Sequence, residues 1–87
     1  MLLVQGTADT INPWSLTQHL YDDAAPPKWI VAIEGADHLT PYTTGPQRGA
    51  IVALVAEFLR ARLQDPSRVT SAQDAANRDG LSLVASA

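Results

Sequence analysis

The sequence predicts an α/β fold in which a strand, a helix, a second strand and a second helix follow one another. Two segments are apolar at nearly every position, which is typical of strands buried on both faces of a parallel sheet. Each is followed by a segment whose apolar residues recur at three- and four-residue steps, as on one face of a helix. A strand, helix and strand in this order form a βαβ unit, almost always right-handed. The predicted architecture is therefore a βαβ unit plus a C-terminal helix.

The first strand is expected at Leu2–Val4, where the chain is apolar before Gln5 and Gly6 end the run. Residues 6–11 then form a turn. Asn12 is expected as the N-cap of the first helix, with Pro13 as its first residue, because these residue types favour those positions. The helix runs to about Asp23, and Pro26-Pro27 prevents its continuation.

The second strand is expected at Lys28–Ile33, which is rich in Trp, Ile and Val. A loop over residues 34–38 ends in His38, and a longer loop with Pro41, Gly45 and Pro46 follows. The strongest helical pattern in the chain is Arg48–Leu63. Its apolar stripe consists of Ile51, Leu54, Val55, Phe58 and Leu59, with Arg62 in line and Leu63 beside it.

Residues 64–87 are expected to be a disordered tail. Asp65-Pro66-Ser67 interrupts the helix, and the following residues are mostly Ala, Ser, Asp and Asn. Residues 1–63 are then a fragment of a larger domain, because two parallel strands alone leave two open edges and an incomplete core. Open edges also predict self-association of the chain.

The composition excludes several classes of function. The chain has 87 residues, no cysteine and a net charge of −3. Scattered basic residues argue against a nucleic-acid partner. No apolar run approaches the roughly 20 residues of a spanning helix, so we expect no membrane span. No Cys or His spacing fits a metal site, and no cofactor is implied.

Asp9 and His38 are the candidate catalytic residues. Each follows a predicted strand, and ligands of open α/β sheets bind outside the carboxyl ends of the strands. An Asp followed by a His in the chain matches the order of acid and base in a hydrolase triad. Taken alone, each residue equally fits an ordinary turn or loop role.

Two stretches resemble the α/β-hydrolase family. Residues 2–13 (LLVQGTADTINP) look like the strand and turn that carry the catalytic Asp, and residues 32–38 (AIEGADH) look like the His loop. Both are similar to the cutinase and polyester-hydrolase, dienelactone hydrolase-like branch. The resemblance covers residues 2 to about 63 and implies that they are the C-terminal part of an α/β-hydrolase, the last portion of its parallel sheet. It implies that Asp9 is the triad acid, His38 the general base and Ile11 a substrate-contacting side chain.

The family's G-x-S-x-G nucleophile motif is absent. None of the serines has glycine two residues away on both sides; they are Ser15, Ser67, Ser71, Ser82 and Ser86. The resemblance therefore implies that a serine hydrolase acting on small or polymeric esters has its nucleophile outside this chain. Two alternatives stay open. One is a hydrolase with an Asp nucleophile, as in dehalogenases and epoxide hydrolases. The other is a non-catalytic truncated product or βαβ module that completes its sheet on a partner.

Four other residues invite a functional interpretation but favour a structural one. Asp37 directly precedes His38, and adjacent side chains rarely face each other, so we expect a turn residue. His19 lies on a polar stretch of the first predicted helix and is expected at the surface. Trp14 and Trp29 are expected in the core.

Overall fold

The computed structural model describes residues 1–87 as a small mixed α/β domain built on a three-stranded sheet in the order β1-β2-β3. Strand β1 (Leu2–Gly6) lies parallel to β2 (Trp29–Ile33), with Leu2 opposite Trp29 and Gly6 opposite Ile33. Strand β3 (Leu81–Ser86) is antiparallel to β2. The predicted βαβ unit is present, but the sheet is mixed rather than parallel.

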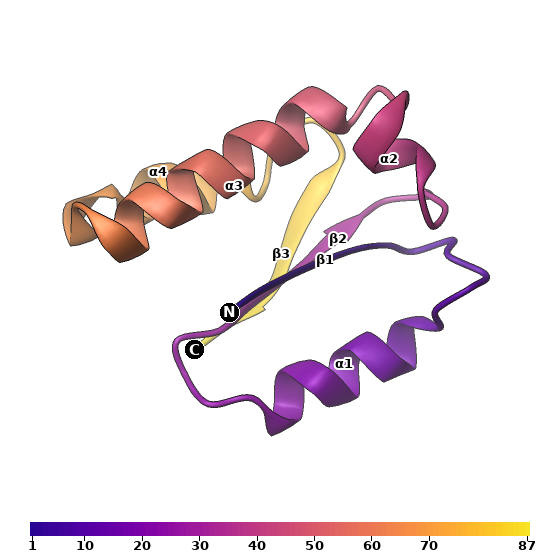
Figure 1. Ribbon diagram of the computed structural model, residues 1–87, viewed down its shortest axis with the longest axis horizontal. Coiled ribbons are helices and arrows are strands. Elements are labelled where there is room, and N and C mark those ends of the chain that lie inside the picture. Colours follow the sequence, from indigo (N-terminus) through magenta and orange to yellow (C-terminus); the bar gives the residue numbers. More distant parts are fainter.

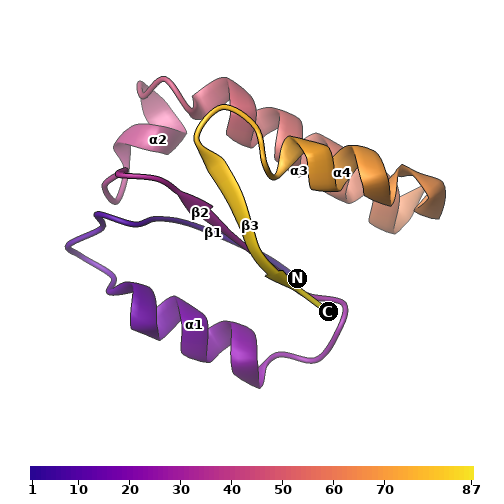
Figure 2. The ribbon, with the colours of Figure 1, turned by 180° about the vertical axis from the view of Figure 1, so that it is seen from behind.

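Helices cover both faces of this sheet (Figure 1). Helix α1 (Trp14–Asp23) covers one face, and α3 (Arg48–Leu63) and α4 (Val69–Ala75) cover the other, as the view from behind also shows (Figure 2). A short helix α2 (Thr40–Thr43) precedes α3, and a 3-10 turn η1 (Pro66–Arg68) joins α3 to α4. No helix of the structure combines the length and the apolar character needed to cross a bilayer.

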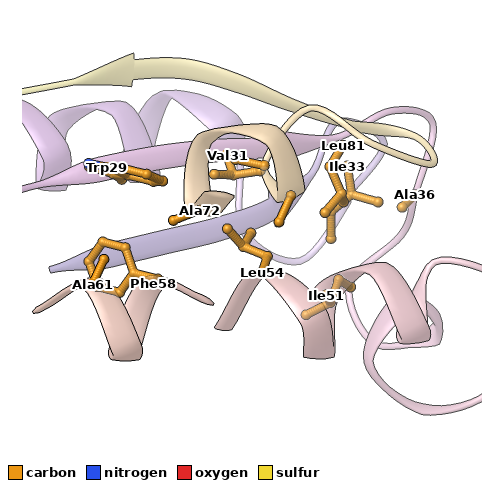
Figure 3. Close-up of a cluster of buried hydrophobic side chains, with 12 residues drawn as sticks. Trp29, Val31, Ile33, Ala36, Ile51, Leu54, Phe58, Ala61, Ala72 and Leu81 are labelled. Atoms are coloured by element: carbon orange, nitrogen blue, oxygen red, sulfur yellow. The ribbon is translucent and has the colours of Figure 1, made fainter. Parts of the chain in front are cut away.

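Strand β2 is the centre of the domain, and all five of its residues are buried. It has a neighbouring strand on each side and a helix layer over each face, which explains why its sequence is apolar throughout. On the α3 face, Trp29, Val31 and Ile33 join a cluster of 12 buried residues. Figure 3 shows this cluster, in which Leu54 is fully buried and the Trp29 and Phe58 rings meet edge to face at 5.2 Å.

The helix predicted at Arg48–Leu63 is confirmed residue for residue. Its buried face is narrower than the predicted stripe, because Val55 and Leu59 remain 38% and 47% exposed. The expectation that Asn12 caps the first helix is wrong. Helix α1 begins at Trp14, Pro13 is its N-cap, and no side chain caps it. The reason is that Asn12 belongs to the Asp9 turn, to which its backbone N–H donates.

Residues 64–87 do not form the expected disordered tail. They contain η1, α4 and β3, and α4 with the residue after it buries Ala72, Ala75 and Ala76 in the core. Alanine is a strong helix former, so a segment poor in large apolar residues can still form a helix and pack. A turn with positive φ at Asp79 and Gly80 then leads into β3.

The two sheet edges differ from the two fully open edges expected. Strand β3 covers one side of β2, and the Leu83 N–H of β3 donates to the Asn77 side chain. In a parallel pair, alternate residues of a strand direct their backbone N–H and C=O groups to the neighbouring strand. Met1 and Thr7 bond β2, through Trp29 and Ile33, so the backbone groups of Leu2 and Val4 face away from β2. No further strand covers the edge of β1, although the Tyr42 hydroxyl donates to its Val4 carbonyl.

Candidate active site

The loop after β1 holds Asp9 in a tight turn. Asp9 Oδ1 accepts hydrogen bonds from the backbone N–H groups of Ile11, at 2.8 Å, and Asn12, at 2.9 Å. Side-chain bonds of this kind to following backbone groups are typical of Asp in turns. The Asp9 side chain is only 4% exposed. One carboxylate oxygen is thus engaged by its own loop, and Oδ2 remains for another partner.

The loop after β2 lies against the Asp9 loop at the same end of the sheet (Figure 1). The Ala8 N–H donates to the Ala36 carbonyl at 2.9 Å, and the Gly35 N–H donates to Thr7 Oγ1 at 2.7 Å. This contact depends on Gly6, where a Cβ would fall within clashing distance of the Ala36 carbonyl. Gly35 has a φ of +69°, a conformation that glycine adopts without strain.

These loops bring Asp9 and His38 together, as the sequence predicted. Asp9 Oδ2 lies 2.9 Å from His38 Nδ1. A carboxylate can only accept, so in the neutral imidazole Nδ1 carries the proton and donates it to Asp9. His38 Nε2 is then the lone-pair nitrogen, and it makes no hydrogen bond within the chain. The ring is 36% exposed, so Nε2 can take a proton from a group outside the chain.

Several effects act on the pKa of the Asp9 carboxyl. Desolvation raises it, but hydrogen bonds from the Asn12 N–H, His38 and the Ile11 N–H, with the charge of His38, outweigh desolvation. The pKa of Asp9 is therefore lowered from its ordinary value. A lowered pKa keeps this carboxyl ionised at neutral pH, which is the state that accepts a hydrogen bond from His38.

The other candidate residues lie as follows. Ile11 is 68% exposed and its N–H holds Asp9, which leaves its apolar side chain free beside the pair. Asp37 accepts hydrogen bonds from the backbone N–H and hydroxyl of Thr40 at the start of α2, and thus acts as a turn residue. His19 is exposed on α1. Trp29 is in the core, whereas Trp14 is only half-buried.

Tyr42 is a neighbour of the site that sequence reasoning missed. Its hydroxyl donates to the outward-facing Val4 carbonyl of β1 at 2.7 Å. Desolvation raises the pKa of Tyr42, and the negative charge of Asp9 raises it further. No local pattern could have identified this residue, because it reaches a strand 38 positions earlier in the chain.

An apolar groove of about 500 Å³ lies at the open edge of β1. All the side chains that line it are hydrophobic, and they come from β1, α2 and α3: Leu2, Val4, Tyr42, Ile51, Val55, Phe58 and Leu59. A strand edge that no other strand covers, beside an apolar groove, suits a further strand with apolar side chains on that face. We call this surface the β1 groove.

No hydroxyl or thiol of the chain reaches His38 Nε2. The chain has no cysteine, and none of its serine or threonine hydroxyl groups is hydrogen-bonded to His38. The structure also brings no group of three metal-ligating side chains together. Comparison of the chain with protein-family models, with curated proteins and with solved structures finds no match, so function is inferred from the geometry of Asp9 and His38.

Proposed function

We propose that this chain supplies the acid and the general base of a serine hydrolase that cleaves carboxylic esters through an acyl-enzyme. One observation carries the proposal. Asp9 Oδ2 lies 2.9 Å from His38 Nδ1 at the carboxyl ends of two neighbouring parallel strands, and Nε2 is free. An imidazole oriented by a buried carboxylate is the base that activates a weak hydroxyl nucleophile.

In this reaction His38 Nε2 takes the proton of the attacking serine hydroxyl. It returns that proton to the leaving alcohol when the tetrahedral intermediate collapses. Asp9 holds the Nδ1–H tautomer and stabilises the imidazolium formed in between. A second cycle with water in place of serine releases the acid. The exposed side chain of Ile11 is proposed to contact the substrate.

The nucleophile and the donors of the oxyanion hole are proposed to lie outside residues 1–87, in a protein segment that extends the sheet. The β1 groove supports this arrangement, because it is apolar and adjoins outward-facing backbone groups of Leu2 and Val4. A strand placed there parallel to β1 would end near the Asp9 loop. Its following turn could then present a serine to His38.

The direct test is expression of this reading frame together with any in-frame upstream sequence. We expect the longer protein to hydrolyse p-nitrophenyl esters and to react with a fluorophosphonate probe at a serine outside residues 1–87. His38→Ala should lower kcat about 10⁴-fold or more, and Asp9→Asn should have an effect of the same order. The 87-residue chain alone should show no turnover above a denatured control.

Two matched variants serve as controls. His19→Ala removes the other histidine, which is exposed on α1, and Asp37→Asn alters the neighbouring carboxyl, which bonds Thr40. Both should retain turnover within a few-fold. A longer protein whose hydrolysis is indifferent to His38, or an upstream sequence closed by a stop codon, would exclude the proposed activity.

A non-catalytic module is the second candidate, and β3 is the observation that favours it. This strand covers one side of β2, and α4 completes a core of 12 buried residues. A chain with such a core could serve as a binding module that adds a partner's strand at the β1 edge. Co-purification of a separately encoded partner strand with the 87-residue chain, without esterase activity in the complex, would favour this candidate.

A further inference from the structure

Gln5 is a polar side chain buried on the α1 face of strand β1. It is 6% exposed, and both ends of its amide are engaged. Nε2 donates to the Asn12 carbonyl at 2.5 Å, and Oε1 accepts from the hydroxyl of Thr17 in α1. Thr17 is itself 7% exposed. The amide therefore ties the strand to both the Asp9 loop and the helix that follows it.

An amide in this position is costly unless it is hydrogen-bonded. One of its two contacts, the bond to the Asn12 carbonyl, reaches the Asp9 loop. Gln5 holds the carbonyl of Asn12, and the N–H of Asn12 donates to Asp9 Oδ1 at 2.9 Å. Asp9 Oδ2 in turn bonds His38. Hydrogen bonds joined through the backbone of Asn12 thus connect Thr17, Gln5 and Asp9 with the imidazole.

We propose that Gln5 and Thr17 are positioning residues for Asp9. By holding the Asn12 carbonyl against strand β1, they restrain the residue whose N–H donates to Asp9 Oδ1, and this leaves Oδ2 directed at His38. The inference rests on the proposed function, since it assigns these residues to the same acid and base. The inference also goes beyond the proposed function, because it adds residues of β1 and α1 to the site. These residues lie on the face of the sheet opposite the β1 groove.

Thr17→Val tests this proposal in the 87-residue chain, because valine keeps the shape of threonine and removes the hydroxyl. The readout is the tautomer of neutral His38, measured from its ¹⁵N chemical shifts, with the Asp9 carboxyl titrated by ¹³C NMR. We expect the Nδ1–H tautomer to lose population and the pKa of Asp9 to rise toward its ordinary value of 3.8. Thr17→Ser, which restores a hydroxyl, should recover both signals.

Thr70→Val is the matched control, since Thr70 is exposed on α4 and makes no side-chain hydrogen bond. Asp37 and Tyr42 also sense the charge of Asp9, but neither is hydrogen-bonded to Gln5 or Thr17, and neither residue is substituted in these variants. Gln5→Met is the second variant, because it removes both amide contacts at similar volume. It should shift the two signals at least as far as Thr17→Val.

A different result is expected if Gln5 and Thr17 only stabilise the fold and do not position Asp9. If Thr17→Val and Gln5→Met lower the thermal midpoint but leave the His38 tautomer and the Asp9 titration unchanged, the positioning role is excluded. Unfolding of both variants would also count against it, because the contacts would then serve the fold. These readouts need no turnover, so absence of esterase activity in the longer protein would overturn the proposed function and leave this coupling measurable.

Discussion

At the scale of single residues, the approach of two loops decides whether Asp9 can reach His38. Gly6 is where they come closest, because its missing Cβ makes room for the Ala36 carbonyl. The backbone bonds from Thr7 to Ile33 and from Ala8 to Ala36 follow directly after it. A side chain at position 6 would push against backbone rather than against a flexible side chain. The neighbouring loop would have to move.

Gly6→Ala should therefore destabilise the domain by about 1–3 kcal/mol, the usual range for overpacking. It should also weaken the bond between Asp9 and His38, seen as a loss of the His38 Nδ1–H tautomer. Gly49→Ala is the control, because Gly49 lies in α3 and a Cβ there would meet only open space. Replacing a helical glycine there should stabilise by about 0.5–1 kcal/mol. Equal midpoints for the two variants in urea unfolding would show that position 6 has room.

At the scale of elements, an ion-pair cluster fastens the end of α3 to the turn η1. Glu57 accepts two hydrogen bonds from Arg68 Nη2 at 2.9 Å and one from Arg60 at 3.0 Å. Hydrogen bonding from Arg68 lowers the pKa of Glu57, desolvation opposes this, and the charges of Arg68 and Arg60 lower it further. The cluster thus holds the segment that leads to α4.

The pKa of Glu57 is lower in the folded state than in the unfolded state. Its ion pairs therefore stabilise the fold fully at a pH above the unfolded pKa of 4.5. This stabilisation is lost as the pH falls through the folded pKa. Glu57→Gln should lower the thermal midpoint modestly at pH 7, and the difference from the wild type should vanish in acid. Glu34→Gln, at an exposed residue without an ion pair, should change little. A Glu57→Gln deficit that persists at pH 3 would contradict the assignment.

At the scale of the whole molecule, residues 66–86 complete the domain. They add the outer strand β3 and bury Ala72, Ala75, Ala76 and Leu81 against the cluster on α3. Without them, part of the β2 face that carries Val31 would be exposed, and the edge of β2 that pairs with β3 would have no partner strand. β3 thus covers the β2 edge that the other strand leaves, and the β1 groove lies at the opposite edge of the sheet.

Truncation after residue 64 should abolish cooperative unfolding, because exposed strand edges and apolar surface would remain. Two substitutions in β3 compare the loss of a buried side chain with the loss of an exposed one. Leu81→Ala, at a side chain 4% exposed, should cost about 2–5 kcal/mol. Val84→Ala, at a side chain 48% exposed, should cost no more than about 0.5 kcal/mol. Circular dichroism melts would measure all three. A truncated chain that melts like the full one would restore the expectation of a disordered tail.

The open β1 groove should make the isolated chain associate as its concentration rises, because an apolar groove lies beside a strand edge that no other strand covers. Leu59→Glu puts a charge into the groove and should shift size-exclusion elution toward the monomer. Leu63→Glu is the control, since Leu63 is 77% exposed and does not line the groove. Association that both variants leave intact would place the contact elsewhere.

Features that depend on neighbouring residues could be predicted from the sequence. The order of β1, α1, β2 and α3 follows from local apolar patterns, and so does the position of Asp9 and His38 after two strands. Because parallel neighbouring strands end at the same edge of a sheet, the contact between Asp9 and His38 could also be predicted. Local pattern failed at residues 64–87, where small alanines and a weak strand become ordered only through packing on α3 and β2.

Contacts between residues far apart in the chain could not be predicted from local pattern and are seen first in the fold. The antiparallel addition of β3, the bond of Tyr42 to Val4 and the engagement of Gln5 by Thr17 and Asn12 have no local signal. Each depends on how helices lie over the sheet, which sets the partners that a buried polar group can reach. Gln5 illustrates this difference. In the sequence it is only the end of an apolar run, whereas in the fold its buried amide bonds the Asp9 loop at Asn12.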